Sequence, residues 1–438
     1  MPTPASPPDA DSAAQAAEAA EAAARRSYGK LVAILAGRTR DVAAAEDALS
    51  EAFAAALADW PARGVPQAPE AWLLTVARRK RVDAVRRDRL DEEASRQLLW
   101  LADEIDEHDP SAVPDRRLGL LFACAHPGID AAVRAPLMLQ VVLGFDAATI
   151  ASAFLVAPAA MGQRLARAKA KIRQAGIGFE VPACDALRER LDAVLDAIYA
   201  AYAEGWSDPE GADARRRNLA GEAIWLGRLL ASLLPDAPEA LGLLALMLHA
   251  HARRDARRDA AGDYVPLAAQ DPARWDAALI DEAEALLSRA GRLGQPGRFQ
   301  LEAAVQSAHA VRRRRGEADW SAIEQLYEAL ATLTGSPVAA LNHAVALART
   351  RGPQAGLQAL QPLGADRRLA DYQPYWAARA ELLLQAGDRA EALQAYTRAI
   401  GLESDPAVRR FLQRRAEAAS VGTPPQDQAD PPGRFARD

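Results

Sequence analysis

Two basic stretches of this 438-residue chain carry side chains suited to binding phosphate groups rather than to making or breaking bonds. Arginine and lysine displace counterions from a polyanion, and arginine and glutamine can also hydrogen-bond to base edges. The second stretch, residues 159–175, holds five bases and no acid. The side chains concerned are Arg78, Arg79, Lys80, Arg81, Arg86 and Arg87 in the first stretch, and Gln163, Arg164, Arg167, Lys169, Lys171 and Arg173 in the second.

A charged helix face that meets only solvent is the plainer interpretation of either stretch. Asp83 and Asp88 interleave the bases of the first stretch, which keeps that interpretation open there. The second stretch has no acid, whereas a helix that serves only solubility mixes both signs, so binding to a polyanion is favoured. Two further basic runs, Arg253–Asp259 and Arg312–Arg315, are interpreted as solvated faces, with contact to DNA or to the first half of the chain as the alternative.

Residues for catalysis or metal binding do not gather in the sequence. Cys124 and His126 have no further cysteine or histidine nearby, and His249 and His251 point to different sides of a helix. No glycine-rich phosphate loop, G-x-S-x-G or H-E-x-x-H motif occurs. We therefore expect no enzymatic activity, no catalytic residue, no metal and no cofactor.

The composition predicts an all-α fold with no membrane contact. Half of the residues are hydrophobic, 26% are charged and 5% are aromatic, and the abundant alanine, leucine, arginine and glutamate favour helices. No apolar run reaches the roughly 18 residues of a membrane span, and the N-terminus does not resemble a signal peptide. Two cysteines, Cys124 and Cys184, make no disulfide framework, so we expect a cytoplasmic protein.

Charge divides the chain into successive parts. Residues 21–90 hold 13 Lys/Arg against 9 Asp/Glu, residues 91–111 hold eight acids and one arginine, and residues 115–176 hold eight bases and three acids. The predicted parts are a disordered N-terminus at 1–20, a helical unit at 21–90, an acidic linker at 91–114, a second helical unit at 115–178, a helical extension at 185–295, repeat helices at 296–419 and a disordered tail at 420–438.

The second basic stretch belongs to a helix-turn-helix pattern. A helix over Arg134–Leu143 should end at Gly144, which suits a left-handed stop, and Asp146 should cap a short helix over Ala147–Phe154. Pro158 fits the first turn of a third, basic helix. A plain helical hairpin is the alternative to a DNA-binding arrangement. The predicted buried side of the third helix is Met161, Leu165, Ala168 and Ile172.

Apolar positions at helical spacing indicate the cores of the other parts. Trp72 lies on the apolar face that precedes the first basic stretch; it is a core residue in the plainer interpretation and a base-stacking residue in the alternative. Near the C-terminus the spacing is typical of a tetratricopeptide repeat, which favours a stacked solenoid that docks other proteins. The positions that carry this pattern are Trp376, Ala380, Leu383, Ala392, Tyr396 and Ala399.

Two motifs, in this order, resemble the extracytoplasmic-function group of bacterial RNA polymerase sigma factors. DVAAAEDALSEAFAAAL at 41–57 and AWLLTVARRKRVDAVRR at 71–87 are similar to that family's second conserved region, and GFDAATIASAFLVAPAAMGQRLARAKAKIR at 144–173 is similar to its fourth. DWSAIEQLYEAL at 319–330 and SPVAALNHAVAL at 336–347 resemble a subgroup with a long tetratricopeptide-like extension. The chain departs from the family pattern at Ser50, Lys80, Thr149 and Ala160.

The resemblance implies a role for each basic or acidic stretch. The helix with Gln163, Arg164, Arg167, Lys169, Lys171 and Arg173 would enter the major groove of the −35 element. The face with Trp72, Arg78, Arg79, Lys80, Arg81, Arg86 and Arg87 would bind the melted −10 element. Asp41, Asp47 and Glu51, on the preceding helix together with Glu46, would contact the core polymerase.

The sequence therefore predicts a sigma factor with a region 2 helical bundle, a region 4 helix-turn-helix and a tetratricopeptide-like α-solenoid. It would direct core RNA polymerase, through the β′ clamp helices and the β flap, to promoter DNA. The solenoid would regulate or assist this activity in cis and would dock a protein regulator. Two alternatives stay open: a helix-turn-helix regulator and a tetratricopeptide scaffold, neither of which binds core polymerase.

Overall fold

The computed structural model describes residues 10–37, 41–88, 116–154, 156–179, 181–182, 184–206 and 214–421. Within these ranges every regular element is a helix, and the β-type pairing present is an isolated antiparallel bridge between Arg258 and Tyr264. The prediction of an all-α fold is confirmed. The chain divides into two compact units, Met1–Ala201 and Tyr202–Asp438.

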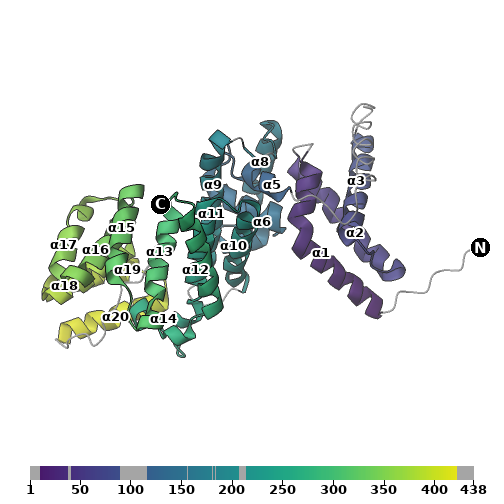
Figure 1. Ribbon diagram of the computed structural model, residues 1–438. Coiled ribbons are helices and arrows are strands. Elements are labelled where there is room, and N and C mark those ends of the chain that lie inside the picture. Colours follow the sequence, from purple (N-terminus) through teal and green to yellow (C-terminus); the bar gives the residue numbers. More distant parts are fainter. Residues whose placement is uncertain are drawn as a thin grey trace, which may run out of the picture. The chain divides into compact units, whose positions relative to one another are not determined.

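The first unit contains two groups of helices that follow one another in the chain (Figure 1). The predicted linker at 91–114 falls between these groups and lies outside the described residues. The helices are α1 (Ala10–Ala36), α2 (Val42–Arg63), α3 (Pro69–Asp88), α5 (Arg117–Cys124), α6 (Ala131–Leu143), α7 (Ala147–Ala153), α8 (Pro158–Gln174) and α9 (Cys184–Trp206), whose last residues belong to the second unit.

The N-terminal helix is longer than the sequence predicted. α1 begins at Ala10, so the expectation of a disordered segment at 1–20 is wrong for residues 10–20, while residues 1–9 lie outside the described ranges. Ala16, Ala20 and Ala23 are buried. Their spacing of four and three puts them on one helix face, where small side chains allow close packing. A segment without large apolar residues is therefore helical because alanine favours the helix and fits the packed face.

The turns that precede α8 follow the predicted geometry. Gly144 ends α6 with a φ of 77°, in the left-handed region. At the start of α7 a side-chain oxygen of Asp146 accepts a hydrogen bond from the backbone N–H of Thr149 at 2.8 Å. Pro158 occupies the first turn of α8. The buried side of α8 is the predicted one: Met161, Leu165, Ala168 and Ile172.

The second unit is a succession of helices joined by short turns, with one longer connection between α11 and α12 (Figure 1). No helix in the described part of the chain has the length and apolar character needed to cross a bilayer. The helices are α10 (Ala214–Leu233), α11 (Pro238–His251), α12 (Ala277–Arg292), α13 (Arg298–Ala310), α14 (Arg312–Arg315), α15 (Trp320–Thr334), α16 (Pro337–Arg351), α17 (Pro353–Leu360), α18 (Gln373–Ala386), α19 (Arg389–Leu402) and α20 (Pro406–Val421), with short 3₁₀ turns η1 (Arg254–Ala256), η2 (Leu267–Ala269), η3 (Pro272–Arg274) and η4 (Pro362–Ala365).

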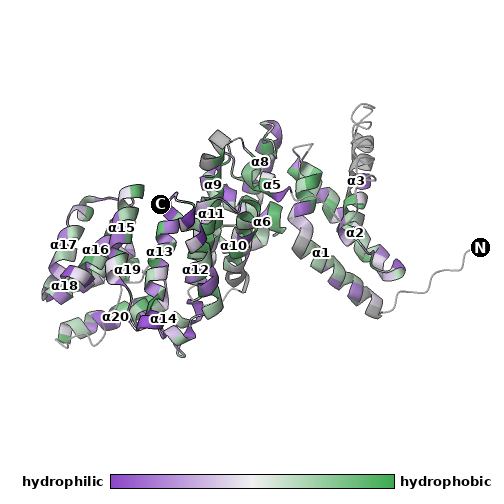
Figure 2. Ribbon diagram, in the orientation of Figure 1, coloured by the Kyte–Doolittle hydropathy of each residue, from purple (hydrophilic) through white to green (hydrophobic). Residues whose placement is uncertain are grey.

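Consecutive helices of the second unit pack in pairs, as in α15 with α16 and α18 with α19. Most helices carry both hydrophobic and hydrophilic residues along their length (Figure 2). In the last pair, Trp376 is partly buried against a common core. Assignment of these pairs to the tetratricopeptide class stays a prediction. The repeat positions within that core are Ala380, Leu383, Ala392, Tyr396 and Ala399.

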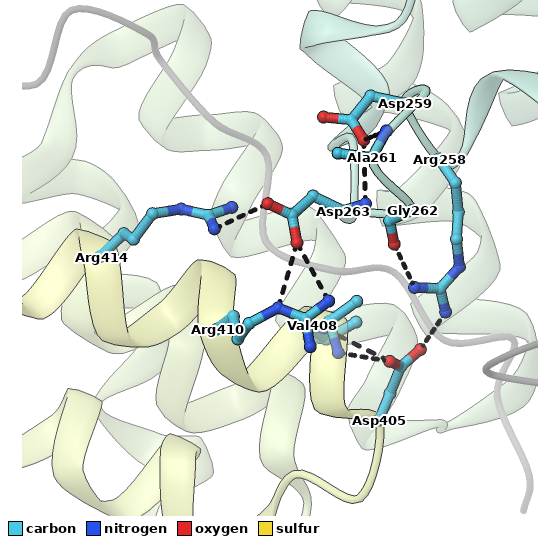
Figure 3. Close-up of polar contacts among 10 residues, drawn as sticks. Arg258, Asp259, Ala261, Gly262, Asp263, Asp405, Val408, Arg410 and Arg414 are labelled. Carbon is cyan, nitrogen blue, oxygen red and sulfur yellow. Dashed lines mark hydrogen bonds and ion pairs between the residues drawn. The ribbon is translucent and has the colours of Figure 1, made fainter.

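Ion pairs tie the α11–α12 connection to the last helix (Figure 3). Asp263 binds Arg410 and Arg414 of α20 at 3.0 and 2.9 Å. Arg258 binds Asp405, directly before α20, at 2.8 Å. Segments about 150 residues apart in the sequence are therefore joined within the second unit.

The expectation that residues 253–259 form a solvated face is wrong, because all four arginines of this run are partly buried. Burial lowers the pKa of both Arg253 and Arg257, because protein atoms surround their guanidinium groups. The physical reason is that the chain turns after α11 and lies against α13, where Arg253 donates a hydrogen bond to Gln306. In the second basic run, residues 313–315 are exposed as expected, whereas Arg312 is partly buried.

Candidate nucleic-acid interface

α8 presents its polar residues on the side opposite its buried face. Arg167 donates through Nε to the carbonyl oxygen of Gln163, one turn earlier, at 3.3 Å. Lys169 is partly buried. Because the helix contains no carboxylate, its open side is uniformly cationic. The exposed polar residues are Gln163, Arg164, Arg167, Lys171, Arg173 and Gln174.

Lys169 forms an ion pair with Glu46 of α2, which the sequence did not reveal. The Lys169 ammonium lies 2.7 Å from a Glu46 carboxylate oxygen, and the two side chains are 15% and 11% exposed. Burial raises the pKa of Glu46, and the positive charge of Lys169 opposes this rise. The pair therefore joins α8 to α2 across 123 residues of sequence.

A second ion pair lies at the start of α2. Arg173 binds Asp41 at 3.2 Å, with side chains 55% and 22% exposed. Asp41 also caps α2, because its side chain accepts the backbone N–H of Ala44 at 3.1 Å. The exposed arginine makes this pair weaker than the buried one. Two bases predicted to contact DNA thus bind acids on the helix predicted to contact the polymerase.

Backbone packing reinforces the contact between the two helix groups. A Cβ atom on Gly29 of α1 would lie 2.3 Å from the carbonyl oxygen of Val142 in α6, so this approach requires glycine. One residue earlier, the ring of Tyr28 lies against Gly144. The contact between α1 and α6 is therefore close and apolar, in addition to the ionic contacts between α2 and α8.

The aromatic and basic residues of α3 differ in exposure. Trp72 is partly buried and meets Trp60 of α2 edge to face, with ring centroids 5.5 Å apart. Burial and the nearby Arg116 lower the pKa of Arg78. Arg79 is exposed. Trp72 thus contributes to the core, as in the plainer interpretation, and keeps part of its surface accessible.

The remaining candidates on α2 and α3 are more open. Lys80 lies 3.5 Å from Glu51, and both side chains are about half exposed. Asp47 is exposed one turn before Glu51 on the same face of α2. The side chains of Arg81, Arg86 and Arg87 lie outside those that the structure describes.

Cys124 and His126 do not form part of a metal site within the described residues. Cys124 is buried, and burial raises the pKa of its thiol. The Nδ1 atom of His126 accepts a hydrogen bond from the backbone N–H of Gly128 at 3.0 Å, which stabilises a local turn.

The sequence placed Glu46 on the helix predicted to contact the polymerase, but it did not reveal that Glu46 forms an ion pair with Lys169 of α8. Its partner could not be found from spacing, because helical periodicity relates residues within one helix and not residues of two distant helices. The one available signal is complementary charge: α8 is basic, and the first half of α2 carries Glu46 and Asp47.

Comparison with known proteins identifies two regions of the chain. Residues 24–90 match sigma-70 region 2, which covers the C-terminal half of α1 and all of α2 and α3. Residues 190–291 match a family of unknown function, DUF6596. The uncharacterized protein R00370 of Rhizobium meliloti (strain 1021) is 40% identical over 393 residues, which span 87% of this chain and 92% of that protein. No solved structure matches the chain.

Proposed function

Because this chain belongs to the same family as Rhizobium meliloti protein R00370 and contains a sigma-70 region 2, we propose that it is a sigma factor of the extracytoplasmic-function type. It recruits core RNA polymerase to promoter DNA. The single observation that carries this proposal is the region 2 match at residues 24–90. The role requires binding and positioning rather than covalent chemistry, so the protein is not an enzyme.

In this proposal α3 binds the −10 element and α2 binds the polymerase. Arg79 and Lys80 are exposed on α3, where they can reach phosphates of a melted strand, and Trp72 keeps an accessible edge for stacking. Asp47 and Glu51 present two carboxylates on one open face of α2, which suits the β′ clamp helices.

α8 reads the −35 element in the proposal. Gln163, Arg164 and Arg167 are exposed and form no ion pair with any described residue, so they are available to bases and phosphates as the protein stands. Arginine and glutamine can make paired hydrogen bonds to guanine and adenine. Lys169 reaches DNA only when α8 separates from α2, because its ammonium is buried against Glu46. Arg173 is 55% exposed and has only to leave its weaker pair with Asp41. The β flap of the polymerase then holds the separated helices.

The decisive experiment combines a polymerase pull-down without DNA and run-off transcription with purified core enzyme. We expect the full-length chain to bind core polymerase and to start transcription at specific promoters. Arg164→Glu/Arg167→Glu should abolish promoter-specific transcripts and leave polymerase binding intact. Arg313→Glu/Arg314→Glu, the same charge change on exposed residues of α14, should leave both unchanged.

Other results would favour the alternatives. Specific DNA binding without polymerase binding would identify a conventional helix-turn-helix regulator. Absence of both would favour a helical scaffold. Loss of polymerase binding together with DNA binding in Arg164→Glu/Arg167→Glu would indicate misfolding, which circular dichroism would reveal.

We also propose that the second unit acts on the first in cis and docks a protein regulator on its helical pairs. A truncated chain that lacks the second unit tests this proposal. The contacts of α9 determine the residue at which the truncated chain should end. Arg190 donates to the carbonyl oxygen of Phe122 at 2.9 Å and lies over the Phe122 ring, so the first half of α9 belongs to the first unit. Residues 1–206 are therefore the correct truncation. Run-off transcription equal to that of the full chain in every condition would exclude control in cis.

A further inference from the structure

The two helix groups of the first unit, α1–α3 and α5–α8, share an interface on α1. Leu31, Val32 and Ala33 follow one another in α1 and are all fully buried. Successive residues of a helix point about 100° apart, so their burial requires cover on more than one side of α1. α2 and α3 supply one part of this cover, and α5 and α6 supply the other. The α5–α8 group is therefore packed against the α1–α3 group.

A contact between backbones fixes this packing at one place. A Cβ atom on Gly29 of α1 would lie 2.3 Å from the carbonyl oxygen of Val142 in α6. A Cβ atom on Gly144, which ends α6, would meet the ring of Tyr28 at 3.1 Å. Neither glycine leaves room for a side chain, so a larger residue at Gly29 must force the two groups apart.

The same packing engages charged side chains that the proposed function requires. The Nζ atom of Lys169 lies 2.7 Å from a carboxylate oxygen of Glu46, and the two side chains are 15% and 11% exposed. Arg173 binds Asp41 at 3.2 Å. Both bases belong to α8, the proposed DNA-binding helix. Asp41 is a proposed polymerase contact, and Glu46 directly precedes another, Asp47. One interface therefore engages residues of both binding faces.

The two groups can separate without unfolding either one. No described helix runs through both groups, because α3 ends at Asp88 and α5 begins at Arg117. The charged side chains can exchange partners, since carboxylates of α2 can pair with cations of another protein and the bases of α8 with phosphates. Separation also exposes apolar surface of α1 and α6 to water, so the free protein favours the closed arrangement. Opening then requires a partner that compensates for this exposure.

We propose that the packing of α5–α8 against α1–α3 is a self-inhibited state of the free protein, which holds α2 back from core polymerase and Lys169 back from DNA. This inference rests on the proposed sigma-factor function and adds its regulation. A partner that binds only the open state has its apparent affinity reduced in proportion to the open fraction. Binding of polymerase to α2 therefore releases the full basic side of α8, and the two binding events favour each other.

Pulsed electron spin resonance on the full-length chain measures the closure without any partner. Spin labels are attached at Ala58→Cys in α2 and Ala175→Cys after α8, two exposed positions. Cys124→Ala and Cys184→Ser remove the native thiols. We expect a short, narrow distance distribution in this labelled parent. Gly29→Leu should give a longer and broader distribution, because its side chain has no room between α1 and α6.

Matched variants separate opening from misfolding. Gly291→Leu in α12 should keep the parent distance, because a Cβ atom there meets nothing within 4 Å. Lys169→Glu places two carboxylates together and should lengthen the distance. Glu46→Lys/Lys169→Glu restores opposite charges and should return the distance to that of the parent. Parent-like distances in both Gly29→Leu and Lys169→Glu would overturn the closed state.

Titration with core polymerase in the absence of DNA tests the inhibition itself. Gly29→Leu should bind polymerase at least fivefold more tightly than the parent, and Gly291→Leu should bind as the parent does. Polymerase should also lengthen the distance in the labelled parent. If Gly29→Leu does not fold, as circular dichroism would show, Lys169→Glu replaces it as the open variant.

The outcomes distinguish failure of this inference from failure of the proposed function. Equal polymerase affinity of the parent and an open variant would overturn self-inhibition and leave the sigma-factor function in place. Absence of polymerase binding in the parent and in every open variant would overturn the proposed function, and with it the inhibition that rests on it.

Discussion

At the scale of single residues, Glu46 and Lys169 illustrate how a charge pair can hold two helices without being favourable in itself. Burial raises the pKa of Glu46 despite its contact with Lys169 at 2.7 Å. Desolvation therefore outweighs the attraction, as is common for buried pairs. Such a pair costs most when one member is removed, because the other charge is then buried alone.

A double-mutant cycle tests this reasoning. Lys169→Met should lower the free energy of unfolding by about 3 kcal/mol, whereas Glu46→Leu/Lys169→Met should lie within about 1 kcal/mol of the parent. Without Lys169 the pKa of Glu46 rises further, so the cost of Lys169→Met is full above the Glu46 pKa of the variant and shrinks as the pH falls through it. Urea denaturation at several pH values measures this; a Lys169→Met variant as stable as the parent would contradict the buried pair.

His249 makes the second unit sensitive to acid. Its pKa is about 3 in the folded chain and about 6.5 when unfolded, so between these values only the unfolded state takes up the proton. The free energy of unfolding therefore falls as the pH drops, and His249 alone accounts for a loss of about 2 kcal/mol between pH 7 and pH 5. In denaturant titrations of His249→Gln, the free energy of unfolding should fall between pH 7 and pH 5 by about 2 kcal/mol less than in the parent. An unchanged dependence would mean that His249 is protonated in the folded state.

At the scale of helices, the sequence alone predicted the features that depend on a single helix and its ends. The buried side of α8, its start at Pro158 and the left-handed stop at Gly144 follow from periodicity and local backbone preference. The partners of α8 and of Arg253 could not be predicted, because these contacts join segments 123 and 53 residues apart. The burial of the Glu46–Lys169 pair and the contact of Arg253 with Gln306 arise only in the tertiary structure.

Gly29 offers a test of the close contact between α1 and α6. Gly29→Ala would bring a Cβ atom within 2.3 Å of the Val142 carbonyl oxygen, so the helices must separate. We expect a loss of about 1–3 kcal/mol in the free energy of unfolding. Gly162 in α8 is the matched control, because a Cβ atom there meets nothing within 4 Å. Gly162→Ala should gain up to about 1 kcal/mol from its higher helix propensity. Equal effects of the two substitutions would rule out the close contact.

At the scale of the whole molecule, the division at Ala201 and Tyr202 separates the helices that match sigma-70 region 2 from the unit that contains the buried His249. Each unit has its own buried core, and a chain of this kind departs from two-state unfolding. The substitutions proposed above fall cleanly on one side or the other, since Gly29 belongs to the first unit and His249 to the second.

Differential scanning calorimetry of the full-length chain should therefore resolve two transitions. Gly29→Ala should lower the temperature of one of them, and a change from pH 7 to pH 5 should lower the other through the uptake of protons by buried histidines on unfolding. His249→Gln should reduce the second shift and leave the first transition in place. A single transition that shifts under all of these changes would mean that the two units unfold together and do not differ in stability.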